Sequence, residues 1–148
     1  MGLKSIISTG GGGGSGGVIN PSPPTTTVSG ITIILTAGEN LAFGDNVYIK
    51  SDGKVWKSNA TTAALIPTVG MAAAAITANN TGNILLDGTA TNSSWTWTIG
   101  GLLYASTTSG AMTQTQPSNT DNVIQVVGRA LTATTVLFNP SPDYITYI

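Results

Sequence analysis

The chain repeats one short pattern, and this repetition limits the folds it can adopt more than any other feature. The first copy, GDNVYIKSDGKVWKS, covers residues 44–58, and the second, GGLLYASTTSGAMTQT, covers residues 100–115. In each copy an apolar run with a tyrosine ends at a polar turn containing glycine, and a shorter run returns. Alternating residues on both sides of Asp52-Gly53 predict a β-hairpin with a tight primed turn, because such turns need positive φ. The second copy predicts a matching hairpin around Ser109-Gly110.

The segments after the two hairpins also correspond. VGMA at residues 69–72 matches VGRA at residues 127–130, and a small-residue turn and an apolar strand follow each. These apolar strands are residues 84–86 and 136–138. The period is about 57 residues, and two copies are too few for a solenoid. We therefore expect one β-unit built twice within a single closed β-body, the pseudo-repeat covering about residues 40–91 and 96–139.

The rest of the chain favours strands over helices. ITIILT, residues 31–36, is rich in β-branched residues and predicts a buried strand. Four alanines favour a helix at residues 69–78, but the match to residues 127–131 predicts a strand. Gly88 predicts a bulge in the strand at residues 83–91. Turn signals recur throughout, so the expected fold class is all-β, a small antiparallel β-sandwich or barrel built from two similar hairpin-containing units.

The first part of the chain differs in composition from the rest. Residues 1–29 predict a flexible Gly/Pro-rich N-terminal arm, and residues 30–148 a single β-domain. The run GGGGGSGG at residues 10–17 maximises flexibility, and the prolines of the following PSPP stiffen the chain. One interpretation is an unimportant terminus, and the other is an arm that docks on a partner. The candidate contact residues of such an arm are Lys4, Ile6, Ile7, Val18 and Ile19.

The composition excludes several kinds of chemistry. The chain has no cysteine and no histidine, which rules out disulfides, thiolate or imidazole metal sites and histidine-based triads. Only 7% of residues are charged and the formal net charge is −1, so there is no basic cluster to bind nucleic acid. No apolar run is long enough to span a membrane. We expect no cofactor, no nucleic-acid or membrane partner, and synthesis in a reducing cytoplasm.

The acidic residues do not form a recognisable catalytic pattern. Glu39, Asp45, Asp52 and Asp121 lie in or beside predicted turns, where such side chains serve backbone geometry. Asp45 with Asp87 or Asp121 would make a glycosidase-like pair if the fold brought them together, but nothing in the sequence does so. We therefore expect a protein that is not an enzyme.

Aromatic residues are the best candidates for recognition. Alternation places Trp95 and Trp97 on one face of a predicted strand, with Tyr104 nearby. Their rings would stack on sugars, or pack in a core or subunit interface, and the packing interpretation is favoured. Arg129, the only arginine, is predicted to pair with a carboxylate within the domain or across a subunit interface. The tail containing Tyr144 and Tyr147 is expected to need burial, either as the last strand of the body or as a strand given to a neighbour.

Two longer runs are VGMAAAAITANNTGNILLDGTA and WTWTIGGLLYASTTSGAMTQTQPSNTDNVIQVVGRALTATTVLFNPSPDY. They contain a VG-x-A strand, a G-x-x-LL-x-G strand, a GG-x-x-Y-x-S-T hairpin and an FNPS ending. In these motifs the chain resembles tailed-bacteriophage virion proteins of the head-decoration and head-fibre kind, over about residues 40–144. The resemblance implies a small β-domain that forms a homotrimer on the outside of a capsid. Similar modules also close the ends of phage tail fibres.

These observations lead to one leading hypothesis and one alternative. The leading hypothesis is a non-enzymatic virion structural protein that decorates or cements the outer surface of a phage capsid, as a trimer bridging capsid subunits. Its partners would be the major capsid protein and further copies of itself, and it would be made in the cytoplasm of the bacterial host. The alternative is a receptor- or glycan-binding module of a phage tail or head fibre, with a host surface glycan as the partner.

Overall fold

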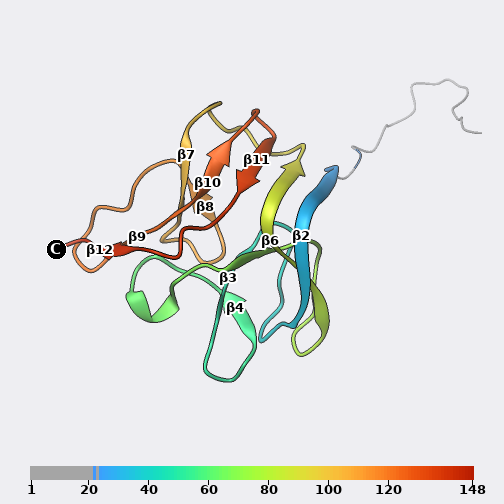
Figure 1. Ribbon diagram of the computed structural model, residues 1–148, viewed down its shortest axis with the longest axis horizontal. Coiled ribbons are helices and arrows are strands. Elements are labelled where there is room, and N and C mark those ends of the chain that lie inside the picture. Colours follow the sequence, from blue (N-terminus) through green and yellow to red (C-terminus); the bar gives the residue numbers. More distant parts are fainter. Residues whose placement is uncertain (1–21, 23) are drawn as a thin grey trace, which may run out of the picture.

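The described part of the chain is all-β, which confirms the predicted fold class. The computed structural model describes Ser22 and residues 24–148. The candidate arm residues Lys4, Ile6, Ile7, Val18 and Ile19 lie outside the described residues. The described residues contain no α-helix, but one 3-10 turn, η2 (Ala63–Leu65), and a curled antiparallel sheet forms most of the body (Figure 1).

Two sheets contain the strands of the described residues. The large sheet has nine strands: β2 (Thr26–Thr36), β3 (Asn46–Ile49), β4 (Val55–Lys57), β5 (Gly70–Ala72), β6 (Thr81–Asn92), β7 (Leu102–Ala105), β8 (Met112–Thr113), β10 (Val126–Ala130) and β11 (Thr135–Phe138). The small sheet pairs β9 (Val123–Ile124) with β12 (Ile145–Thr146). The order of the large sheet is β4-β3-β5-β6-β11-β10-β7-β8, and β2 pairs with β6 beside this path.

The path of the large sheet has the same pattern from either end. In the first half, β3 forms a hairpin with β4 and pairs with β5, and β5 pairs with β6. In the second half, β7 forms a hairpin with β8 and pairs with β10, and β10 pairs with β11. The registers also correspond, because Met71 pairs with Leu85 in the first half as Arg129 pairs with Leu137 in the second. The apolar strands that the sequence matched to each other are β6 and β11, and these two strands join the halves by pairing.

Backbone hydrogen bonds between the two hairpins curl the sheet. The N–H of Asn46 donates to the carbonyl of Gly110 at 2.8 Å, and the N–H of Gly110 donates to the carbonyl of Ser58 at 2.8 Å. These bonds hold the loop between β7 and β8 against the β3–β4 hairpin, so that the two ends of the path meet. The sheet therefore encloses a core as a half-barrel.

Two apolar cores lie on opposite faces of the first half. The smaller core contains inward residues of β3 to β6 such as Val47, Ala72 and Ile84. The larger core contains Met71 and Leu85 from the other face of the same strands, together with buried residues of the second half such as Phe138. The residues of the second half that correspond to Met71 and Leu85 are Arg129 and Leu137, and they face outward. The first half is thus covered on both faces and the second half on one.

β6 contains a bulge, but its extra residue is Leu86 and not Gly88 as predicted, and Gly88 pairs with Gly30. Opposite the consecutive residues Ile31 and Thr32 of β2, β6 supplies Asp87 and Leu85, so that Leu86 is the extra residue. Gly88 has φ 147°, in the region that favours glycine. The extra residue shifts the alternation of β6, so that Leu85 before the bulge and Ala90 after it both face the larger core.

The strand at residues 31–36 is not buried, contrary to the prediction. It belongs to β2, which pairs with β6 alone among the described strands and so forms an edge of the sheet. The side chains of Ile31 and Ile34 are 63% and 68% exposed. β2 also begins at Thr26, before the expected start of the β-domain at residue 30. A β-branched run indicates a strand, but the number of its neighbours decides whether that strand is buried.

Three local expectations need correction. The first hairpin forms, but Gly53 has positive φ and Asp52 does not, and the N–H of Gly53 donates to the Lys50 carbonyl in a longer loop than a tight primed turn. The strand expected at residues 69–78 is β5, which covers Gly70–Ala72 alone. Trp95 and Trp97 lie in the loop between β6 and β7 and not on a strand.

Candidate functional site

Three acidic side chains around the first hairpin hold backbone groups in place. Asp45 accepts the N–H of Ala42 at 2.8 Å and lies 3.5 Å from the Lys57 ammonium. Glu39 accepts the N–H of Lys57 at 3.1 Å. Asp52 accepts the N–H of Lys54 at 2.9 Å, and this bond lowers the pKa of the Asp52 carboxyl below its ordinary value. These contacts stabilise loops.

The described residues contain no group of three or more acidic side chains placed to hold a metal ion. Asp45 and Asp87 line different pockets of the surface. Asp121 has φ 68° in the turn before β9. No helix within the described part of the chain is long and apolar enough to cross a membrane.

The two tryptophans singled out from the sequence meet in an aromatic pocket. The ring centroids of Trp95 and Trp97 are 5.9 Å apart, and those of Phe43 and Trp95 are 6.0 Å apart. The pocket has a volume of about 230 Å³. Its lining residues are Phe43, Gly44, Asp45, Trp95, Trp97, Gly110, Ala111 and Met112.

Backbone contacts from both halves of the fold position this pocket. The N–H of Trp97 donates to the Ala133 carbonyl at 2.8 Å, and the N–H of Trp95 donates to the Asn92 carbonyl at 3.0 Å. The three rings also pack against the larger core, so they combine a structural role with an accessible face. Tyr104, expected nearby, is on β7 and does not line the pocket.

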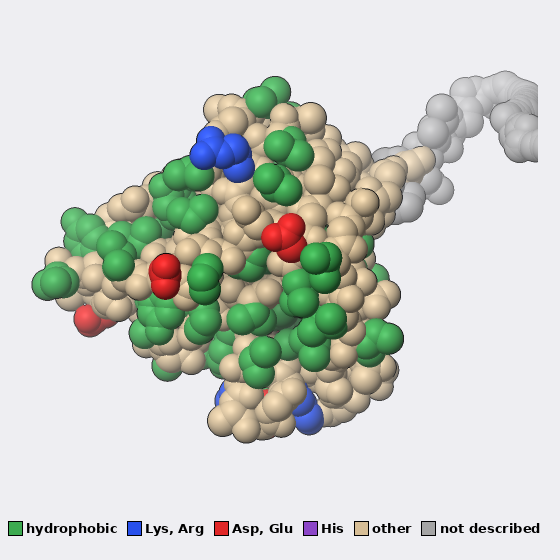
Figure 2. Space-filling view, in the orientation of Figure 1, with side chains coloured by type: hydrophobic (Ala, Val, Ile, Leu, Met, Phe, Trp, Pro, Cys, Tyr) green, Lys and Arg blue, Asp and Glu red, His purple; other side chains and the backbone are tan. Residues whose placement is uncertain are grey.

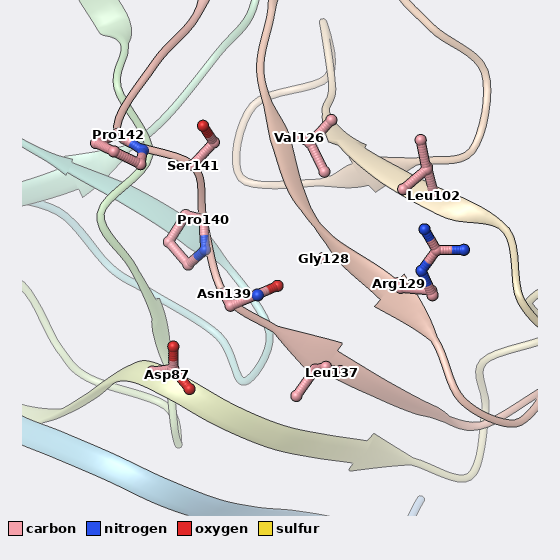
Figure 3. Close-up of a pocket in the computed structure, with 10 residues that line it drawn as sticks. All are labelled: Asp87, Leu102, Val126, Gly128, Arg129, Leu137, Asn139, Pro140, Ser141 and Pro142. Carbon is pink, nitrogen blue, oxygen red and sulfur yellow. The ribbon is translucent and has the colours of Figure 1, made fainter.

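A second hollow, of about 500 Å³, lies on the outer face of the second half (Figure 3). Arg129 and Leu102 lie side by side at one end of it, and Asp87 of β6 lies at the other. The guanidinium of Arg129 donates to the Gly100 carbonyl at 2.8 Å. Within the described residues no carboxylate lies within ion-pair distance of Arg129, so the expected pair inside the domain does not form.

The C-terminal tail is the last strand of the body. β12 pairs with β9, and the N–H of Tyr147 donates to the Asn122 carbonyl at 2.7 Å. Of the two outcomes considered from the sequence, the described chain therefore shows the tail in its own domain. The side chains of Tyr144 and Tyr147 nevertheless remain exposed, because the small sheet covers the backbone of the tail and not its side chains.

Apolar side chains are frequent on the surface, and charges are few. Figure 2 shows hydrophobic side chains spread in groups over one face, with a small number of charged ones among them. The most exposed large apolar residues of β2 are Ile31, Ile33 and Ile34. Figure 1 shows β2 beside β6 at the margin of the sheet. The candidate surfaces are thus an aromatic pocket, an outer hollow and an apolar edge.

No protein-family model and no curated protein sequence matches this chain.

Proposed function

We propose that this protein is a non-enzymatic structural subunit of a phage virion, which decorates or cements the outer surface of the capsid. The observation that carries the proposal is the apolar surface of a body with few charges, above all the exposed isoleucines of β2. Extended apolar surface on a small domain marks a surface that another molecule covers. The resemblance of the motifs to head-decoration proteins supports the virion, and the major capsid protein, as the setting.

The proposed mechanism is non-covalent binding to the capsid through several weak contacts at once. The body buries its apolar surface against neighbouring subunits, and the N-terminal arm extends along the capsid surface. The start of β2 provides a firm anchor for that arm, because Thr25 and Ser93 exchange two hydrogen bonds of 2.9 and 3.0 Å. Copies that associate with one another present several arms together, and their weak contacts multiply through effective concentration. The resemblance implies a trimer for this association.

Removal of the arm tests the proposal. We expect the full-length protein to co-sediment with undecorated phage heads, and a protein lacking residues 1–21 to lose at least about tenfold in affinity, since each lost contact also removes its avidity. This truncation leaves β2 whole. A full-length protein in which residues 10–17 are replaced by a shuffled Gly/Ser run of equal length is the control, and it should bind normally. Absence of binding by the full-length protein would contradict the decoration role.

The aromatic pocket favours a second candidate function, the binding of a host surface glycan by a fibre module. Aromatic faces next to a carboxylate acceptor suit a sugar ring, whose surface is apolar on its faces and polar at its rim. Phe43 and Trp95 supply the aromatic faces, and Asp45 supplies the carboxylate in the lining of the same pocket.

Under this second function, Trp95→Ala should weaken the binding of a hexose glycoside at least about tenfold, because it removes the central ring of the pocket. Trp56→Ala is the matched control, since Trp56 lies on β4 outside the pocket. Titration of a panel of methyl glycosides by calorimetry measures the effect. Equal affinities of the two variants, or no binding by the wild-type protein, would exclude the pocket as a sugar site.

A further inference from the structure

β2 leaves a long row of backbone groups without a partner in the described structure. All of its eleven residues lie opposite β6, from Thr26 opposite Asn92 to Thr36 opposite Thr81. No other strand within residues 24–148 pairs with β2. Only its C-terminal end is bordered, where the next residue, Ala37, bridges Val55 of β4 and the N–H of Gly38 donates to the Val55 carbonyl at 2.8 Å. The N–H and C=O groups of one strand residue point to one side, and those of the next residue point to the other. About half of the backbone groups of β2 therefore point away from β6. Such an edge is a template for another strand.

The features that usually protect an edge strand are missing from β2. The sequence TTVSGITIILT contains no charged residue and no proline. The strand is long, and the extra residue of the nearby bulge belongs to β6 and not to β2. Ile31 and Ile34 are exposed, so the edge offers β-branched side chains as well as hydrogen bonds. The edge is therefore suited to pairing rather than protected from it.

The length of β2 identifies its partner. The two ends of the sheet path are β4 and β8, with three and two residues, and neither is long enough to cover the open part of the eleven-residue β2. Among the described strands that end or border the sheet, a second β2 alone has the same length. Two β2 strands can pair antiparallel about a two-fold axis, which makes the interface self-complementary. The absence of charge means that no like charges meet across the axis.

We propose that β2 is a self-association edge, at which two copies of the chain pair their β2 strands antiparallel and join two nine-stranded sheets into one. With the axis at Gly30, Thr26 lies opposite Ile34 and Val28 opposite Thr32, and the end of β2 beside β4 stays outside the pair. The inference deepens the proposed structural role, on which it rests for its biological setting. A two-fold pair yields a dimer, in place of the three-fold association implied by the resemblance.

The mass of the full-length protein in solution tests the proposal. Sedimentation equilibrium over about 1–100 μM should give twice the chain mass of 14.9 kDa. Ile34→Lys should raise the dissociation constant at least about tenfold, because it places two lysines in the paired edges. Ile99→Lys is the control: Ile99 is 67% exposed, close to the 68% of Ile34, but lies in the loop between β6 and β7. Far-UV circular dichroism verifies that both variants are folded.

Each other outcome overturns the pairing. A monomer at all concentrations excludes it, a trimer excludes two-fold pairing as the main contact, and equal effects of Ile34→Lys and Ile99→Lys place the interface elsewhere. The failures of the two proposals are distinguishable. A monomer that binds phage heads removes the β2 dimer and keeps the capsid role, with a strand of the capsid as the occupant of the edge. A dimer that does not bind heads keeps the pairing and removes the capsid role.

Discussion

Gly88→Ala is expected to destabilise the protein by about 4 kcal/mol, which lowers the thermal midpoint by roughly 12 °C. A Cβ at position 88 would lie 2.1 Å from the carbonyl oxygen of Ser29 and 2.8 Å from the Cα of Gly30. Both are backbone atoms of β2, so no side chain can move to make room. Gly88 also has φ 147°, which an L side chain adopts only with strain. The substitution therefore separates β2 from β6 where Gly30 and Gly88 pair.

Gly53→Ala is the matched control for this prediction. Gly53 also has positive φ, 79°, but a Cβ there would meet nothing within 4 Å. The variant should lose about 1 kcal/mol from backbone strain alone. Urea denaturation followed by circular dichroism measures both variants. Similar losses for Gly88→Ala and Gly53→Ala would show that the close approach of β2 and β6 does not limit stability.

Gln125→Met is the second substitution with a large expected effect, also about 4 kcal/mol. Gln125 lies between β9 and β10 in the sequence, and its side chain is buried. Its amide nitrogen donates to the carbonyls of Thr68 and Ser141 at 2.9 and 2.8 Å. Its oxygen accepts the N–H of Thr68 at 2.8 Å. Methionine has a similar size but makes none of these bonds, so the buried backbone groups of Thr68 lose their partners. The amide thus ties the segment before β5 to the segment that follows β11.

Gln114→Met provides the control for Gln125. The Gln114 amide makes the same kind of two-bond clamp, accepting from the N–H of Thr98 at 2.9 Å and donating to its carbonyl at 2.8 Å. This clamp lies at the surface, where water replaces the lost bonds, so the cost should stay below about 1 kcal/mol. Chemical denaturation gives both values. Equal losses would contradict the argument that burial makes the Gln125 contacts expensive to remove.

Local sequence signals explain which parts of the fold were predictable. The alternation around Asp52-Gly53 and Ser109-Gly110 predicted both hairpins, because a chain reversal with positive φ can be recognised from a few neighbouring residues. Gly88 indicated a bulge in β6, but the extra residue is Leu86, and Gly88 itself pairs with Gly30. The match between residues 84–86 and 136–138 pointed to corresponding strands, which form β6 and β11. Each of these inferences needed a local pattern and no knowledge of what packs against it.

The candidate surfaces depended on contacts between distant parts of the chain. Trp95 and Trp97 stood out in the sequence, but the pocket also needs Phe43 and the turn at Gly110. Nothing in the spacing of these residues relates them, since hydrogen bonds between the two hairpins bring them together. Arg129 occupies the place of the buried Met71 yet faces outward, because nothing in the described chain covers the outer face of the second half.

The sequence by itself determined the all-β class and the two hairpins, and it pointed to the matching strands β6 and β11. Each of these follows from the conformational preferences of neighbouring residues. Only the tertiary structure decided that β2 lies at an edge with Ile31 and Ile34 exposed, that the sheet curls to form the aromatic pocket, and that Gln125 links separate segments. The physical reason is that a side chain is buried or exposed according to how many strands and loops cover it, and that number depends on the path of the whole chain.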